Sequence, residues 1–131
     1  GKMTELRSGK DIVIFACGVM VSQSLKAAEI LAKQNIDAKV VNLSTIKPLD
    51  VKRLKAYVKG MKAVITAEEH NKYCGMGSAV AEVLCETGIP IGMVAVDDCF
   101  GTSAENYDKL LEAYHLMPED IVAKVLSMLR K

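Results

Sequence analysis

The chain has 131 residues, half of them hydrophobic and a quarter charged, and its formal net charge is +1. This composition is that of an ordinary globular protein and excludes a disordered, collagen-like or disulfide-stapled chain. The balanced charge gives no support for binding to nucleic acid or to an acidic membrane surface. No apolar run is long enough to span a bilayer. No signal peptide is expected, since no apolar stretch follows the basic start. We therefore expect a single domain over 1–131 in the cytoplasm.

Apolar, β-branched runs alternate with segments of helical periodicity along the chain. Strands are expected over 11–17, 38–43, 62–67 and 91–96, and residues 3–7 are compatible with a short edge strand. Helices are expected over 22–34, 51–59, 75–87 and 107–114, and from 118 onward. This alternation predicts parallel crossovers. The expected fold is α/β, a three-layer α/β/α sandwich whose mostly parallel sheet of four to five strands carries helices on both faces.

Residues at the helix ends support these boundaries. Asp50 is predicted to cap the helix that follows it, Asn35 to end the helix before it, and Pro118 to occupy a first helical position. The helical periodicity predicts inward-facing residues in two of the helices, namely Leu25, Ala28, Leu31, Ala32, Val51, Leu54 and Val58.

The four cysteines do not form a recognisable metal or disulfide motif. Cys17, Cys74, Cys85 and Cys99 show no C-x-x-C spacing and are not interleaved with histidines at zinc-ligand intervals. We expect reduced thiols of a cytosolic protein and no metal site.

Polar residues follow the predicted strand 62–67 directly. Because ligands bind at the carboxyl ends of strands in open α/β sheets, Glu68, Glu69 and His70 lie where chemistry is expected. A carboxylate beside an imidazole can prepare a general base. The same cluster also suits a solvated or interface-forming surface, and the sequence leaves both interpretations open.

Two further turns have a chemical and a structural interpretation. Gly75 and Gly77 open a helix, whose start could bind an anion, or the glycines could let the helix pack closely on the sheet. The dinucleotide fingerprint is incomplete, because Val80 stands where a third small residue is required. Asp97 and Asp98 could hold a metal, although no third ligand is suitably spaced, or could form a turn. The residues alone give no complete catalytic constellation.

Several segments in order resemble a known family. They are residues 9–18, 24–31, 40–50, 66–71 (Thr-Ala-Glu-Glu-His-Asn), 75–82 and 98–103. Together they resemble the C-terminal domain of transketolase and its thiamine-diphosphate relatives, over about residues 9–128. Deoxyxylulose-phosphate synthase and the β subunits of 2-oxoacid dehydrogenases are among these relatives. The runs 45–50 and 66–71 look most like transketolase, particularly the split form whose C-terminal half is a separate subunit.

The resemblance implies a parent transferase that moves a two-carbon ketol unit between sugar phosphates in the pentose phosphate pathway. The family uses thiamine diphosphate and a divalent cation such as Mg²⁺, which other domains hold. Their Gly-Asp-Gly to Asn motif is absent here, and so is the domain that binds the aminopyrimidine. We therefore carry over no catalytic, cofactor-binding or metal-binding residue and expect the isolated chain to be inactive. The expected partners are the remaining transketolase domains or an N-terminal subunit, in a homodimer or heterotetramer.

Five positions match the family's motifs and lie on the expected functional edge. They are Glu69, His70, Gly75, Gly77 and Phe100, for which we expect domain or subunit contacts. The chain departs from the family where Cys74 replaces a usual glycine and Cys17 a common threonine. Two alternatives remain: the same domain in the synthase or a dehydrogenase β subunit, and a free-standing α/β module that binds an anion or a partner.

Overall fold

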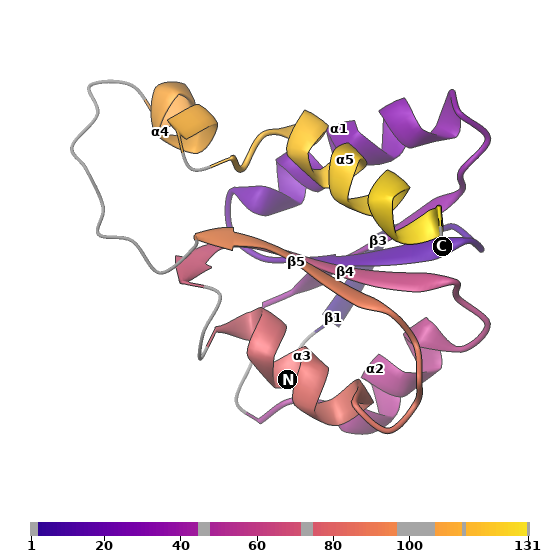
Figure 1. The fold of residues 1–131 in the computed structure, drawn as a ribbon. Helices are drawn as coiled ribbons and strands as arrows, with labels where there is room; N and C mark the ends of the chain where they lie inside the picture. The colour runs from indigo at the N-terminus through magenta and orange to yellow at the C-terminus, as the bar shows by residue number, and fades with distance from the viewer. Residues whose placement is uncertain (1–2, 45–47, 72–74, 97–106, 114, 131) are drawn as a thin grey trace.

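A computed structural model describes residues 3–44, 48–71, 75–96, 107–113 and 115–130 (Figure 1). Within them the strands are β1 (Met3–Arg7), β2 (Ile12–Ala16), β3 (Ala38–Leu43), β4 (Ala63–Asn71) and β5 (Ile91–Val96). The helices are α1 (Met20–Ala32), α2 (Val51–Val58), α3 (Met76–Leu84), α4 (Tyr107–Ala113) and α5 (Pro118–Leu129). The described strands form one sheet of order β1-β3-β2-β4-β5, in which only β1 runs antiparallel to its neighbour. The predicted α/β fold with a mostly parallel sheet is confirmed.

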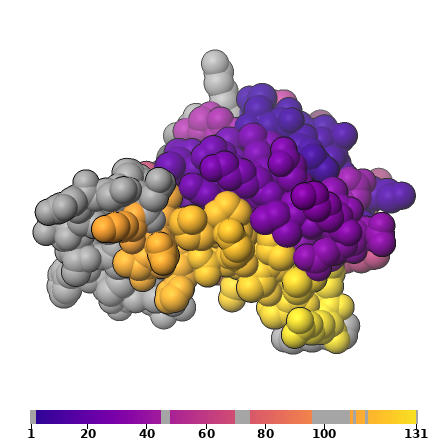
Figure 2. All heavy atoms as spheres, turned by 90° about the horizontal axis from the view of Figure 1, so that it is seen from above, coloured from indigo at the N-terminus to yellow at the C-terminus, as the bar shows by residue number. Residues whose placement is uncertain are grey.

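The central strand β2 explains why its sequence is almost wholly apolar. Ile12, Ile14 and Ala16 pack in one core layer with α1 and α5, to which Leu111 of α4 also belongs. Val13 and Phe15 pack in the opposite layer with α2 and α3. Figure 1 shows these helices on the two faces of the sheet, and Figure 2 shows α5 lying along α1. A strand covered on both faces needs an apolar side chain at every position rather than at alternate ones.

The predicted helix caps at Asp50 and Asn35 are confirmed. The Asp50 carboxylate accepts a hydrogen bond from the backbone N–H of Arg53 at 3.0 Å. Asn35 adopts a left-handed conformation with a φ of 62°. The following N–H, of Ile36, donates to the carbonyl of Leu31 at 3.0 Å, which is the bond that closes a Schellman motif. Asp50 thus caps α2 through its side chain, and Asn35 ends α1 through its backbone conformation.

Several element boundaries differ from those expected, and α1 lies two residues earlier than predicted at both ends. Helix α1 begins at Met20, two residues early, and α3 ends at Leu84 rather than near residue 87. Strand β4 continues to Asn71 instead of ending at Ala67. Its pairing with β5 shifts register between Ala67 and Asn71, so a bulge carries the strand past the point where its apolar run stops.

The buried faces of α1 and α2 also differ in part. Gln23 and Ser24 are buried on α1, whereas Leu25 is half-buried and Ala32 is exposed. On α2, Leu54 and Val58 are buried as expected, but Val51 is 43% exposed. Among the described residues, no helix has both the length and the apolar character required to cross a membrane.

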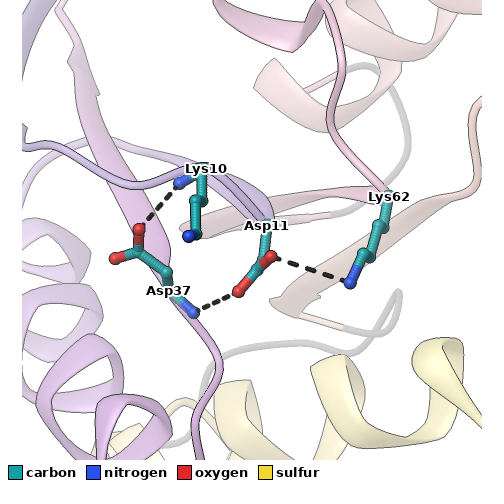
Figure 3. A network of polar contacts seen from close by, with 4 residues as sticks. All are labelled: Lys10, Asp11, Asp37 and Lys62. Carbon is teal, nitrogen blue, oxygen red and sulfur yellow. Dashed lines mark hydrogen bonds and ion pairs between the residues drawn. The ribbon is translucent and has the colours of Figure 1, made fainter.

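A polar network joins the amino-terminal ends of β2, β3 and β4 (Figure 3). The Asp11 carboxylate accepts from the backbone N–H of Asp37 at 2.7 Å and lies 3.7 Å from Nζ of Lys62. The Asp37 carboxylate in turn accepts from the backbone N–H of Lys10 at 3.1 Å. Two side chains thus hold three strand starts together, at the edge of the sheet opposite to the predicted functional edge.

Replacing Asp11 with asparagine is expected to lower the free energy of unfolding by about 1 kcal/mol at pH 7. The Asp37 backbone N–H lowers the pKa of Asp11, and Lys62 and Lys10 act in the same direction against partial burial. A carboxyl whose pKa is lower in the folded state stabilises the protein above its unfolded pKa of about 4. That contribution is lost as the pH falls through the folded value.

Urea unfolding at several pH values would test this expectation. Wild type and Asp11→Asn should differ at pH 7 and converge as the pH falls well below 4. A stability difference that stays constant over this range would show that the Asp11 charge is not responsible.

Candidate functional site

The direction in which the chain moves across the sheet reverses between the neighbouring strands β2 and β4. The chain passes from β2 through α1 to β3 on one side, and from β4 through α3 to β5 on the other. Helices α1 and α3 cover opposite faces, so the connections leaving β2 and β4 diverge (Figure 1). The backbone N–H of Cys17 donates to the carbonyl of Ala67 at 3.3 Å and keeps the two strand ends together. This is the topological switch point, where ligands bind in open α/β sheets.

Glu68 is buried at this point, with 1% of its surface exposed. Its Oε1 accepts a hydrogen bond from the backbone N–H of Met76 at 2.9 Å, and its Oε2 accepts one from that of Gly77 at 2.6 Å. These amides belong to the first turn of α3, where N–H groups have no partner inside the helix and negative charge is favoured. The start of α3 therefore binds a carboxylate of the protein itself, that of Glu68.

Gly77 brings α3 into direct contact with the sheet. A Cβ atom at this position would lie 2.7 Å from Oγ1 of Thr66 and 3.2 Å from Cγ of Met93. Thr66 is fully buried, and its hydroxyl has no hydrogen-bond partner among the residues that the structure describes. The interpretation of Gly77 as a close-packing residue is confirmed.

Glu69, in contrast to the buried Glu68, is exposed. A Cβ atom on Gly18 would lie 3.6 Å from Oε1 of Glu69, so this carboxylate stands beside the turn between β2 and α1. Burial raises the pKa of the Cys17 thiol, and the charges of Glu68 and Glu69 raise it further. A thiol with a raised pKa holds little thiolate at neutral pH, which argues against Cys17 as a nucleophile.

The structure brings three of the predicted interface residues to one edge. Glu69 lies in β4 directly after the buried Glu68, Gly75 immediately precedes α3, and Gly77 lies in the first turn of α3. His70 belongs to β4, but its side chain lies outside the described residues. Phe100 lies outside them too, as do Cys74, Cys99, Asp97 and Asp98.

The Glu68 carboxylate accepts hydrogen bonds from two backbone amides, and a general-base role for Glu68, Glu69 and His70 stays a prediction because the His70 side chain lies outside the described residues. Within the described ranges, no group of three or more histidine, cysteine or acidic side chains is placed to hold a metal. Cys17 and Cys85 are free thiols, and Cys85 is exposed.

The described residues do not fit thiamine diphosphate. The start of α3 is the helix terminus that could cradle a diphosphate at this edge, but its amides are bonded to Glu68.

Sequence reasoning placed Glu68 at the functional edge but missed its role. A glutamate is usually exposed, and nothing in the periodicity of residues 62–71 indicates an inward carboxylate. One feature of the sequence could have indicated this role: a carboxylate shortly before a glycine-rich helix start. The carboxylate is negative and the start of a helix carries partial positive charge, so the two attract each other.

Residues 1–121 match the family described as the C-terminal domain of transketolase. The chain is 42% identical over 123 residues to a 6-deoxy-6-sulfo-D-fructose transketolase subunit from Clostridium sp. (strain MSTE9), which covers 93% of this chain and 38% of that protein. It is 36% identical over 133 residues to a putative transketolase C-terminal section from Methanocaldococcus jannaschii, covering 100% of this chain and 41% of that one. It is also 40% identical over 131 residues to a 1-deoxy-D-xylulose-5-phosphate synthase from Gloeobacter violaceus. That match covers 98% of this chain and 20% of the synthase.

A solved structure shares the fold closely. The chain matches a split gene transketolase, described as an inactive beta4 tetramer, with a TM-score of 0.90 and 42% identity. The match covers 98% of this chain and 42% of that one, so the chain spans less than half the length of each of these relatives. The family match over 1–121, the agreement in fold and the order of the motifs together place the chain in the family of transketolase C-terminal domains.

Proposed function

We propose that the chain is the C-terminal section of a transketolase and contributes to two-carbon ketol transfer between sugar phosphates through contacts with the other sections. In this proposal thiamine diphosphate and Mg²⁺ are held by those sections. The observation that carries the proposal is the internal anion at α3. Glu68 occupies the helix start at which an α/β domain could otherwise bind a phosphate. Because this anion site is already occupied, we propose that the edge formed by the carboxyl ends of β2 and β4 contacts protein instead.

The relatives support a partner in the same enzyme. Two of them bear the word subunit in their names, for a 6-deoxy-6-sulfo-D-fructose transketolase and for an apulose-4-phosphate transketolase from Phocaeicola vulgatus. The contacts proposed here use Glu69, His70, Gly75, Gly77 and Phe100. The exposed Glu69 carboxylate offers a charge that a basic group of the partner can meet.

A second candidate parent is 1-deoxy-D-xylulose-5-phosphate synthase, because a synthase is 40% identical to this chain. The two parents differ in their products. Assaying the assembled enzyme for ketol transfer between sugar phosphates and for synthesis of deoxyxylulose phosphate would distinguish them.

Reversing the charge of Glu69 is expected to weaken association with the remaining sections at least tenfold. The test is the dissociation constant of purified Glu69→Lys and wild-type chains for those sections, measured by isothermal titration calorimetry. Glu29→Lys is the matched control, because Glu29 is an exposed residue of α1 away from the switch point. Equal binding by both variants would contradict the proposed contact edge.

A further inference from the structure

We propose that Glu68 is a positioning residue for assembly. Its carboxylate fixes the start of α3 against the end of β4 and so holds the contact edge in the shape that the remaining transketolase sections bind. This inference rests on the function proposed above and deepens it, because it names the residue that prepares the surface without being part of it.

At the end of β4, two consecutive carboxylates differ in burial. The register shift between Ala67 and Asn71 marks a bulge, and bulges change the direction in which side chains point. Glu68 is 1% exposed, whereas the next residue, Glu69, is exposed. One strand end thus supplies an internal carboxylate that bonds α3 and an external carboxylate on the surface beside it.

The contact with α3 fixes both position and orientation. Two oxygens of Glu68 accept from two consecutive amides, those of Met76 and Gly77, at 2.9 and 2.6 Å. Hydrogen bonds to an ionised group are about twice as strong as neutral ones, and a two-point contact restricts rotation. Gly77 also leaves no space between α3 and Thr66, so the helix start is held from a second side.

This arrangement has a consequence for binding. A surface that is already ordered pays less conformational entropy on association than one that must be ordered by its partner. With 1% of its surface exposed, Glu68 offers a partner almost no direct contact. We therefore expect Glu68 to affect association through the first turn of α3, which it bonds directly.

The test uses Glu68→Gln, which keeps the shape of the side chain but presents an NH₂ group to one of the two amide donors. Calorimetric titration with the remaining transketolase sections is run at a temperature where circular dichroism shows both chains folded. The dissociation constant is expected to rise at least tenfold. The amide resonances of Met76 and Gly77 are expected to move upfield, while those of β2 stay in place.

Asp11→Asn is the matched control, because it removes a charge-assisted contact at the opposite edge of the sheet. It is expected to lower stability while its dissociation constant stays within twofold of wild type. If Glu68→Gln does not fold, Glu68→Asp keeps the charge on a shorter side chain and should weaken binding in the same direction.

The outcomes separate this inference from the proposed function. A folded Glu68 variant that binds as tightly as wild type would overturn the positioning role and leave Glu68 as a stabilising residue only. Failure of the wild-type chain itself to bind would overturn the proposed function, and the positioning role with it.

Discussion

Replacing Gly9 with alanine is expected to lower the free energy of unfolding by about 3 kcal/mol. Gly9 lies between β1 and β2, and a Cβ atom there would overlap the carbonyl carbon of Ala38 and the amide nitrogen of Lys39. These are backbone atoms of β3 and cannot turn aside as a side chain does. The connection would have to lift away from β3, with which β1 pairs. Urea unfolding followed by circular dichroism measures the loss.

Gly60→Ala provides the comparison for this variant. Gly60 has a φ of 80°, and apart from Gly60 and its two chain neighbours no described residue has an atom within 4 Å of the position that a Cβ would occupy. Alanine there carries only the cost of a left-handed conformation, about 1 to 2 kcal/mol. If the two variants lose equal stability, the close approach of Gly9 to β3 is contradicted.

Replacing Glu68 with alanine is expected to cost a similar amount, about 3 kcal/mol. The variant leaves the buried amides of Met76 and Gly77 without their acceptor, and each unsatisfied buried group costs about 1–3 kcal/mol. It also removes negative charge from the positive end of α3. Equilibrium unfolding in urea at pH 7 gives the value.

Glu69→Ala is the control for Glu68→Ala, since it deletes the neighbouring but exposed carboxylate. Surface substitutions of this kind usually change stability by no more than about 0.5 kcal/mol. Equal losses from the two variants would show that the contacts of Glu68 with α3 contribute little.

The contrast between Glu68 and Glu69 has a functional meaning. A helix start at a topological switch point is a common phosphate site, yet here a side chain of the same domain neutralises it. The domain has the architecture of a ligand-binding fold, but the amides at the start of α3 are hydrogen-bonded to its own Glu68 side chain. This is consistent with a section that supports an enzyme whose cofactor is bound elsewhere.

Most of the fold could be predicted because its physical signals are local. A strand such as β2 is buried on both faces and therefore has an uninterrupted apolar run. Asp50, Asn35 and Pro118 mark helix ends through their own side chains or fixed dihedral angles. Each of these signals is contained within a few consecutive residues.

What could not be predicted depends on tertiary contacts. The bulge in β4 arises from pairing with β5 and leaves no trace in the periodicity of residues 62–71. Burial of Gln23 and Ser24 on α1 contradicts their polarity and follows from how the helix lies on the sheet. The role of Glu68 depends on its contact with Met76 of α3, eight positions later in the chain, and the sequence between them does not reveal that contact.

The most direct test of the proposed function is transketolase turnover with and without the remaining sections of the enzyme. The 131-residue chain alone, supplied with thiamine diphosphate and Mg²⁺, is expected to give no turnover. Mixing it with the remaining sections is expected to give both a complex and ketol transfer between sugar phosphates. Turnover by the isolated chain, or full turnover by the remaining sections without it, would contradict the proposal.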